Sequence, residues 1–469
     1  MKRFIYIFIF ILFTVQLHAQ EKSNSRPNII FIFADDMGYN DLGIYDNPYF
    51  RTPNIDKLAT SGWKFTQAYV NASNCAPSRA CLMTGMFTPK HYIYTVATSE
   101  RGKKENRQLV PVKNITILDT SFHTMAEMIS GAGYDCISIG KWHLGDETFG
   151  PLGAGFSKNI GGNEMGSVSS HYKNYKNELP GLQDIPDSTF LADGLTSKAV
   201  EFIKTKNEKP YFLYLPFYSV HTPLQAPQSL IDKYKKIIPE GSPYSPIYAA
   251  MVHNLDQNVG KIVAAVNKYG KPDNTLIIFY SDNGPLLNYT KVNLRGEKGS
   301  LYEGGIREPL IMNWKGYLQP GKIITNTVSA VDFYPTFASL VGADITNVKS
   351  KLDGQSIVPL FENKEIELKP IIWHFPAYLE TYQKGSGIWR ETPSSAIKLG
   401  DWKLITHYET KTTELYNLYT DPKEENNILR KNKSVAKKLE RILKNYLEKT
   451  NAFIPTEKNP FYKSEVVLN

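Results

Sequence analysis

The stretch Asn28-Ile29-Ile30-Phe31-Ile32-Phe33-Ala34-Asp35-Asp36 joins an apolar run to two adjacent carboxylates. An uninterrupted apolar run is typical of a parallel strand that is buried on both faces. Two carboxylates directly after such a strand are costly to bury unless a cation balances their charge, although they could equally cap a following helix. Ligands of open α/β sheets bind outside the carboxyl ends of the strands. The stretch therefore predicts a buried strand with a binding site at its end.

The same pattern recurs three times along the chain. Apolar runs at 134–139, 211–217 and 276–280 are followed by polar groups that can titrate or bind metal, namely Lys141 and His143, His221, and Asp282 and Asn283. Each of these residues alone would more often be structural, but the repetition favours a shared site. Helical stretches at 121–131, 195–205 and 248–269 separate the runs. This alternation predicts an α/β fold with a doubly wound, mostly parallel sheet and helices on both faces.

The pattern changes near residue 365. Short strands are expected at 371–375, 395–399, 401–405 and 413–418, followed by a helix over 434–450 whose apolar residues keep helical spacing. This order predicts a smaller antiparallel sheet with one helix. The chain is therefore divided into an N-terminal α/β catalytic domain over residues 20–364 and a smaller C-terminal α+β subdomain over 365–469.

A second decisive stretch, Asn74-Cys75-Ala76-Pro77-Ser78-Arg79-Ala80-Cys81-Leu82-Met83-Thr84-Gly85, predicts a loop that enters a short helix. Pro77 suits the first helical turn, and Gly85 suits the left-handed position after the last turn. Cys75 would lie at the helix N-terminus, which favours negative charge, and Arg79 could reach the same end. The stretch thus indicates an anion site that contains a sulfur, although a lone Cys-x-Pro is more often a buried cysteine before an ordinary helix.

The N-terminus predicts export. Met1-Lys2-Arg3 is followed by an apolar core over residues 4–13 and by a small residue, Ala19, suited to cleavage. The core is too short to span a bilayer comfortably, and the arrangement is typical of a cleavable signal peptide over residues 1–19. We therefore expect a periplasmic or secreted protein with no stable membrane insertion.

Composition excludes several other classes. The net charge of +8 suits anionic substrates but is too small for a nucleic-acid-binding protein of 469 residues. Only three cysteines occur, so the exported chain is not a disulfide scaffold. Besides Cys75, the other two, Cys81 and Cys136, could pair, but their apolar surroundings favour buried thiols.

The run Cys75-x-Pro77-Ser78-Arg79, followed by Leu82-x-Thr84-Gly85, resembles the signature of the type I sulfatases, which belong to the alkaline phosphatase-like superfamily. The resemblance extends to bacterial polysaccharide sulfatases and arylsulfatases. It implies that a maturation enzyme oxidises Cys75 to formylglycine (3-oxoalanine), an aldehyde whose hydrate is the nucleophile.

The carboxylates and the amide at the strand ends supply hard oxygen ligands. Oxygen donors suit Ca²⁺ or Mg²⁺ and argue against zinc or copper. The resemblance implies one Ca²⁺, with Mg²⁺ the less favoured ion, held by Asp35, Asp36, Asp282, Asn283 and an oxygen of the converted Cys75.

The resemblance also implies a catalytic set of Cys75, Arg79, Lys141, His143, His221 and Lys298. In the implied mechanism, the hydrated aldehyde attacks sulfur while Arg79, Lys141 and the metal stabilise its oxyanion. His221 and Lys298 bind the sulfate, and one of them, with His221 preferred, protonates the departing alcohol. His143 then takes a proton from the second hydroxyl, and sulfate leaves.

A carbohydrate sulfate, from a polysaccharide or glycosaminoglycan, is the expected substrate. The sequence leaves open the sugar, the sulfate position, exo or endo action and the oligomeric state. Substrate-binding candidates near the start of the small domain are His374, Arg390 and Glu391, and weaker candidates in a polar insertion are His171 and Tyr172.

Two alternatives stay open at this point. A phosphomonoesterase or phosphodiesterase of the same superfamily usually has Thr or Ser in place of Cys75 and binds two zinc ions through several histidines. The nine histidines, of which only His143, His221 and, less clearly, His253 and His374 are well placed, fit that poorly. The other alternative is a catalytically silent glycan-binding protein, which would not need a nucleophile, a metal shell and a proton donor together.

Overall fold

The computed structural model describes residues 26–463 apart from 147, 173, 206–207 and 382–387, so the expected signal peptide at 1–19 lies outside the described residues. Within these ranges an eight-stranded sheet forms in the order β5-β4-β6-β1-β7-β8-β2-β9. No helix in the described part of the chain is long and apolar enough to cross a membrane.

The centre of the sheet is parallel. Strand β1 (Asn28–Ala34) lies between β6 (Tyr211–Pro216) and β7 (Thr275–Ser281), and β4 (Asp135–Ile139) and β5 (Lys158–Ile160) extend the sheet beyond β6. Strand β8 (Leu310–Trp314) runs antiparallel to β7 and to β2 (Trp63–Phe65), and β9 (Lys322–Ile324) is parallel to β2. The sheet is therefore mostly parallel, as the sequence predicts.

Strand β1 is buried on both faces. Ile29, Phe31 and Phe33 belong to one hydrophobic cluster, whereas Ile30 and Ile32 belong to the other. This alternation follows from the two-residue period of a strand, because successive side chains point to opposite faces. The apolar run of β1 is uninterrupted because helices cover both faces of the sheet, so that every side chain of the strand is buried.

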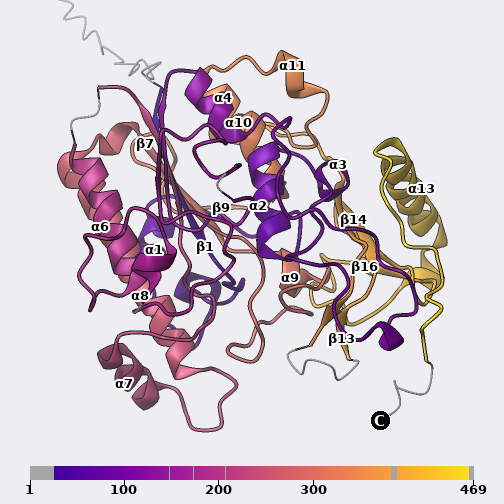
Figure 1. Cartoon of the computed structure of the whole chain (residues 1–469). Helices are drawn as coiled ribbons and strands as arrows, with labels where there is room; N and C mark the ends of the chain where they lie inside the picture. Colours follow the sequence, from indigo (N-terminus) through magenta and orange to yellow (C-terminus); the bar gives the residue numbers. More distant parts are fainter. Residues whose placement is uncertain (1–25, 147, 173, 206–207, 382–387, 464–469) are drawn as a thin grey trace, which may run out of the picture.

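The helices form two layers. Helices α6 (Leu191–Lys204), α8 (Pro246–Tyr269), α7 (Gln228–Ile237) and α1 (Pro53–Thr60) pack together on one face. Helices α2 (Cys75–Thr84), α4 (Met125–Gly131) and α10 (Phe333–Val341) pack together on the other face. In Figure 1, α6 and α8 lie on one side of β1 and β7, and α2 and α10 lie on the other.

The predicted helix boundaries lie within two residues of the observed ones except at the starts of two helices. Helix α4 begins at Met125 rather than Ser121, because Thr124 accepts a hydrogen bond from the backbone N–H of Glu127 and so caps the helix. Helix α6 begins at Leu191, four residues earlier than expected. Cys81 and Cys136 are buried free thiols, with no disulfide among the described cysteines.

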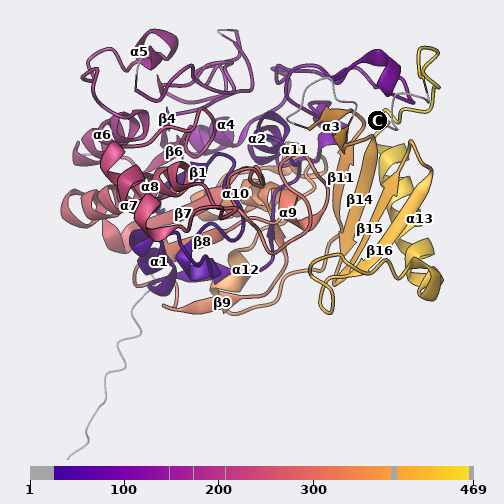
Figure 2. The same ribbon diagram turned by 90° about the horizontal axis from the view of Figure 1, so that it is seen from below.

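The C-terminal part is a four-stranded antiparallel sheet in the order β11-β14-β15-β16. Its strands are β11 (Ile371–Phe375), β14 (Ser394–Leu399), β15 (Trp402–His407) and β16 (Thr412–Asn417). Helix α13 (Lys433–Lys449) packs on one face of this sheet, on the outside of the molecule (Figure 2). The division at residue 365 stays a prediction, because side chains of this sheet join the same hydrophobic cluster as α2 and α10. Below, 'small domain' refers only to the described residues from 365 onward.

A two-stranded hairpin that the sequence does not predict, β12 (Leu379–Glu380) paired with β13 (Trp389–Glu391), lies beside the small sheet. The remaining short elements are β3 (Ala68–Tyr69), β10 (Val328–Ser329), α3 (Thr88–His91), α5 (Tyr175–Glu178), α9 (Glu303–Ile306), α11 (Thr346–Lys349), α12 (Val358–Phe361), and the 3₁₀ turns η1 (Gly43–Tyr45), η2 (Lys104–Asn106), η3 (Pro272–Asn274), η4 (Ala330–Asp332) and η5 (Leu429–Lys431).

Candidate active site

The carboxyl ends of four neighbouring parallel strands meet at one edge of the large sheet. Phe33 of β1 is in register with Pro216 of β6, and Ala34 is in register with Ser281 of β7, so these strands end side by side. The chain continues from them into the predicted polar residues: Asp35 and Asp36 after β1, Lys141 and His143 after β4, His221 after β6, and Asp282 and Asn283 after β7. The structure therefore brings the four sequence patterns to one place.

The predicted metal ligands converge in a buried group. Donor atoms of Asp35, Asp36, Asp282 and Cys75 all lie within 4.8 Å of one another. The backbone N–H of Asp36 donates to Oδ1 of Asp282 at 3.2 Å, and Nδ2 of Asn283 donates to Oδ1 of Asp36 at 2.8 Å. These bonds fix the carboxylates relative to one another and leave the Asn283 carbonyl oxygen as a further donor.

Two oxygens of this group are buried without a hydrogen bond in the described chain, and Oδ1 of Asp35 has Nη2 of Arg79 at a distance of 4.0 Å. Neither Oδ1 of Asp35 nor Oδ1 of Asn283 has a hydrogen bond to any described residue. A buried polar atom left unpaired is costly, so the arrangement needs a ligand that accepts oxygen lone pairs. A hard divalent cation such as Ca²⁺ or Mg²⁺ fits this donor chemistry.

Two cations hold the outer oxygens of the carboxylates. Nζ of Lys141 lies 2.6 Å from Oδ2 of Asp35, and Nη2 and Nε of Arg79 donate to Oδ2 of Asp282 at 2.7 and 3.0 Å. Nη1 of Arg79 also donates to the carbonyl of Lys141 at 3.0 Å, which links the α2 helix to the loop after β4. Both side chains are fully buried, so these pairs operate with little solvent screening.

Cys75 is the first residue of α2, as the sequence predicts, and Gly85 ends the helix at φ 67°. Sγ of Cys75 lies 3.3 Å from Nζ of Lys298 and 3.7 Å from Oδ1 of Asp36. Burial raises the pKa of the Cys75 thiol to about 12, although Lys141 and Lys298 act against this shift. The cysteine as encoded is therefore protonated at neutral pH.

Lys298 and His221 lie on the cavity side of Asp36. Nζ of Lys298 donates to Oδ2 of Asp36 at 2.7 Å, and Nε2 of His221 lies 3.6 Å from the same oxygen. Burial by itself would raise the pKa of Asp36, but Lys298, His221 and Lys141 together hold it below its usual range. Asp36 is therefore a carboxylate that faces cations on more than one side.

The two histidines of the site are held differently. Nδ1 of His221 is 2.8 Å from the carbonyl of Thr222, so Nδ1 carries a proton and Nε2 faces the site. Nδ1 of His143 is buried without a hydrogen bond in the described part of the chain, and its ring packs against Gly166, where an added Cβ would lie 2.4 Å from Cε1. Burial lowers the pKa of His221 to about 3, with Lys298 the next cause, and burial followed by Lys141 lowers the pKa of His143 well below its usual value. Both imidazoles are therefore neutral in this charge environment.

A cavity of about 550 Å³ opens in front of His221 and Lys298. It lies between the large sheet and the small domain, and its described lining residues are Asn74, Val96, Ala97, Arg101, Gly102, His221, Thr222, Leu286, Lys298, Leu379, Glu380, Thr381 and Arg390. The mixed polar and apolar wall next to the charged cluster is the expected form of a substrate pocket.

Of the three predicted substrate-binding residues, only Arg390 reaches this cavity. The prediction that His374 binds substrate is wrong. Its side chain is buried inside the small domain, where Nδ1 contacts Oγ of Ser395 at 2.6 Å and Nε2 contacts the carbonyl of Phe453 at 3.1 Å. Glu391 is also buried, and its Oε2 accepts from the backbone N–H of Leu301 at 3.0 Å, so it supports the Lys298 loop rather than a substrate.

The weaker candidates lie behind the site. His171 is buried, and its Nε2 is 3.2 Å from the carbonyl of His221, so it contacts the backbone of the loop that carries His221. The ring of Tyr172 packs against Phe190. His253, considered for a zinc site, instead contacts the hydroxyl of Tyr234 at 2.9 Å on the far layer of helices. Neither His253 nor His374 is available to a second metal centre.

Arg101 is a lining residue that the sequence analysis missed. It lies in a polar loop without periodicity, and only its position after the Cys75 helix could have drawn attention to it. The loop reaches the cavity through long-range contacts with the small domain, and such contacts have no local sequence signal.

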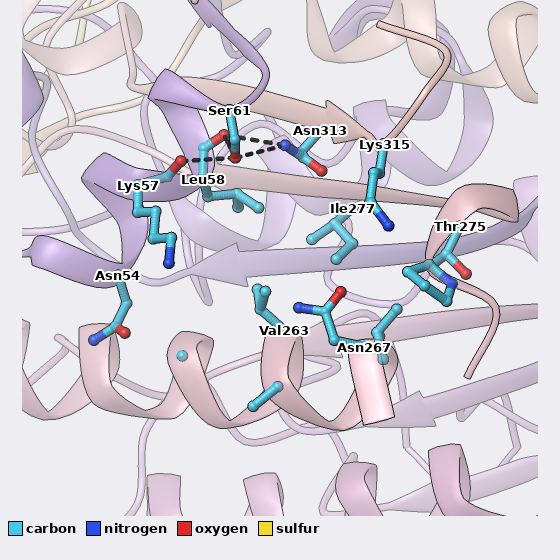
Figure 3. A pocket seen from close by; sticks show the side chains of 14 residues that line it. Asn54, Lys57, Leu58, Ser61, Val263, Asn267, Thr275, Ile277, Asn313 and Lys315 are labelled. Atoms are coloured by element: carbon cyan, nitrogen blue, oxygen red, sulfur yellow. Dashed lines mark hydrogen bonds between the residues drawn. The ribbon is translucent and has the colours of Figure 1, made fainter. Parts of the chain in front are cut away.

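Another pocket, shown in Figure 3, lies at the opposite end of the sheet. Asn54 and Lys57 of α1, Asn267 of α8 and Thr275 at the start of β7 line it, whereas the candidate site follows the end of β7. Because this pocket is at the amino end of the strand, it is separate from the charged cluster.

The fold and this cluster of oxygen donors and cations define a hydrolase of the alkaline phosphatase-like superfamily. A model of the sulfatase family matches residues 27–343, and a model described as N-sulphoglucosamine sulphohydrolase, C-terminal, matches residues 296–452. The chain belongs to the sulfatase family and is a sulfuric ester hydrolase.

Several known proteins are similar over most of their length. A sulfatase of Formosa agariphila is 31% identical in an alignment that covers 100% of this chain and 98% of that protein. Arylsulfatase A of Homo sapiens is 31% identical over 84% of this chain and 77% of its own. The crystal structure of Ps i-CgsB in complex with k-i-k-neocarrahexaose is 30% identical, with a TM-score of 0.75, and the match covers 90% of this chain and 93% of that one.

Proposed function

We propose that this protein is an exported sulfatase that hydrolyses sulfate esters of carbohydrates, with Cys75 converted to formylglycine and one Ca²⁺ in the site. The observation that carries the proposal is the group of buried oxygens around Cys75, of which Oδ1 of Asp35 and Oδ1 of Asn283 have no hydrogen bond in the described chain. The similarity to a structure solved with k-i-k-neocarrahexaose supports a saccharide substrate.

The cation would be held by Asp35, Asp36, Asp282 and Asn283, where it would supply Lewis-acid stabilisation of negative charge. The hydrated aldehyde at position 75, produced by a separate oxidising maturation enzyme, would supply the nucleophilic oxygen. Overall, the sulfate ester and water give the free alcohol and inorganic sulfate.

The remaining residues bind and orient the ester. Nζ of Lys298 lies 3.3 Å from Sγ of Cys75, which places a positive charge where the sulfate meets the nucleophile. His221 directs Nε2 into the cavity because its Nδ1 donates to the carbonyl of Thr222. The negative charge of a bound sulfate ester would favour the imidazolium form of His221, which carries a second proton on Nε2, and we assign this proton to the departing alcohol. His143, two residues after Lys141 in the loop that follows β4, is assigned the proton from the second hydroxyl of the hydrate.

The test is release of inorganic sulfate from protein produced together with a formylglycine-generating enzyme. The substrates are sulfated monosaccharides and short oligosaccharides that differ in sugar and sulfate position, and inorganic phosphate release from the matching phosphate esters is measured in parallel. Cys75→Ala is expected to abolish sulfate release with little change in thermal unfolding. Cys136→Ala, which removes another buried cysteine, is the matched control and should retain activity.

Each outcome is decisive. Sulfate release that depends on Cys75, together with an aldehyde at position 75 in peptide mass spectra, supports the proposal. Normal activity of Cys75→Ala would contradict the nucleophile, and phosphate release alone would favour the phosphatase alternative. Saccharide binding without any sulfate release, by protein that carries the aldehyde, would favour the glycan-binding alternative.

A further inference from the structure

Three segments that are distant in the sequence enclose the cavity in front of His221. The strand ends contribute His221 and Lys298, the loop after α3 contributes Arg101, and the β12–β13 hairpin contributes Arg390. The two arginines therefore come from separate parts of the chain and converge on one space of about 550 Å³. Neither takes part in the proposed chemistry at Cys75.

The Arg101 loop is anchored to the small domain. Glu100 forms a β-bridge with Tyr378, and the backbone N–H of Tyr378 donates to the carbonyl of Ser99 at 3.3 Å. The guanidinium itself is fixed by Nη2, which donates to the carbonyl of Val96 at 2.8 Å. Arg101 is thus a positioned group rather than a freely moving surface side chain.

Arg390 is anchored from the other wall. Its Nη1 donates to the carbonyl of Lys298 at 3.0 Å, and its Nε lies 3.9 Å from Oε1 of Glu297. The Arg390 side chain is only 10% exposed. A guanidinium in this position lies directly behind the lysine that faces Cys75.

The two arginines act on each other electrostatically. Burial lowers the pKa of Arg101, and the positive charge of Arg390 is the next cause, while Cys75 and Glu380 act in the opposite direction. Two like charges on the wall of one partly buried space repel each other, and an anion bound beside both would reduce that repulsion. Lys298 lines the same cavity but is paired with Asp36 at 2.6 Å, and two carboxylates lie near the arginines, namely Glu380 in the wall and Glu297 at 3.9 Å from Nε of Arg390.

We propose that Arg101 and Arg390 form a second anion subsite beside the position of the scissile sulfate. The preferred substrate is then a sulfated saccharide that carries a further anionic group, either a second sulfate or a uronate carboxylate. Planar guanidinium groups match both anions through paired hydrogen bonds. This inference rests on the proposed sulfatase function and specifies its substrate class.

The test compares three disaccharides that share the same scissile sulfate and differ in the neighbouring sugar, which is neutral, sulfated or a uronate. Arg101→Gln is a sharper probe than Arg390→Gln, because Arg390 also holds the Lys298 backbone. Arg430→Gln, at an exposed position of the small domain, makes the same charge change and is the matched control. Arg101→Lys keeps the charge but loses the planar fork.

Wild-type protein should have a kcat/KM for one of the doubly anionic substrates about tenfold or more above that for the neutral-neighbour substrate. Arg101→Gln should remove this preference and lower the value for the neutral-neighbour substrate much less than the value for the preferred substrate, because the neutral sugar places no anion in the subsite. Arg101→Lys should retain part of the preference, and Arg430→Gln all of it. Whichever doubly anionic substrate is preferred identifies the second group as sulfate or carboxylate.

An equal loss on all three substrates, or no preference in the wild type, would overturn the subsite. Calorimetric binding to Cys75→Ala protein separates this result from failure of the proposed function, since binding needs no turnover. Tighter, Arg101-dependent binding of a doubly anionic disaccharide without wild-type sulfate release would contradict the function and support the subsite. Sulfate release by the wild type, together with equal binding of all three disaccharides, would support the function and contradict the subsite.

Discussion

Two buried charge clusters in the described part of the chain are alike in composition and differ in how fully their charges are paired. The site cluster pairs Arg79, Lys141 and Lys298 with three aspartates at the strand ends. The bridging cluster consists of Glu303, Arg307, Lys403 and Glu424, where Lys403 of β15 meets Glu303 of α9 between the small sheet and the large domain. Both are shielded from water, so unpaired charge would be costly in either.

The difference lies in the carboxylate oxygens. In the bridging cluster, Nζ of Lys403 lies 3.0 Å from Oε1 of Glu303 and 2.8 Å from Oε1 of Glu424, and the other two oxygens accept from the Tyr69 hydroxyl and the Glu303 backbone N–H. In the site cluster, Oδ1 of Asp35 has no hydrogen bond among the described residues and lies 4.0 Å from Nη2 of Arg79, and Oδ1 of Asn283 has neither a hydrogen bond nor an ion pair there. A completed ionic cluster holds parts of a fold together, whereas an incomplete one is built for a ligand.

The largest expected effect is a loss of stability when the bridging cluster loses its lysine. Lys403→Met removes the only ammonium group that the described chain places between Glu303 and Glu424. Glu424 then loses its ammonium partner and Glu303 keeps Arg307 at 3.6 Å, which should lower the free energy of unfolding by about 3–5 kcal/mol. Urea unfolding measures this loss. Adding Glu303→Gln and Glu424→Gln should recover part of it, and a Lys403→Met protein as stable as wild type would remove the distinction between the clusters.

A smaller effect, an increase in stability, is expected when Ca²⁺ binds to the site cluster. Ca²⁺ at a hundredfold excess over its Kd should raise the free energy of unfolding by about 2.7 kcal/mol, because the ion binds only the folded site. Urea unfolding with Ca²⁺ and with a chelator measures the difference. Asn283→Leu removes the unpartnered carbonyl oxygen and should lose most of the increase, whereas Lys403→Met should retain it. An increase that persists in Asn283→Leu would mean that the ion binds elsewhere.

The smallest effect concerns His374, a buried group of the small domain that is structural in our account. Burial lowers the pKa of His374 to about 4, and Ser395, Tyr94 and Tyr408 surround its ring. The folded state keeps His374 neutral while the unfolded state gains a proton below about pH 6.5, so the free energy of unfolding should fall by about 2 kcal/mol at most between pH 6.5 and pH 5.

The comparison of wild type with His374→Gln between pH 6.5 and pH 5 isolates this contribution, because glutamine does not titrate. The unfolding free energy of the wild type should decrease more steeply than that of the variant. Sulfatase activity at neutral pH should be similar in both. A variant that folds normally but loses activity would return His374 to the substrate site.

The sequence predicts the parts of this molecule that depend on local pattern. Strand β1 shows its burial on both faces through an unbroken apolar run, and the recurrence of that run predicts the parallel centre of the sheet. The polar residues after these strands could be grouped in advance, because the ends of parallel strands share one edge. The short helix after Cys75 follows from Pro77 and Gly85 in the same way.

The parts that could not be predicted depend on packing between distant segments. His374 and Glu391 look like polar residues near a domain boundary, but the small sheet buries both. Arg101 reaches the cavity only because Glu100 pairs with Tyr378, far along the chain. The hydrogen bonds and ion pairs of Lys403 likewise join segments that no sequence period connects.

The walls of the cavity imply how enzymes on this scaffold diversify during evolution. The groups assigned to chemistry lie on strand ends that are fixed by the sheet, while Arg101 and Arg390 lie on a loop and a hairpin that contact each other at the edge. Mutations, insertions or deletions in these two segments can change which saccharide is accepted without moving the nucleophile. Substrate range and reaction chemistry are therefore inherited on separate pieces of the chain.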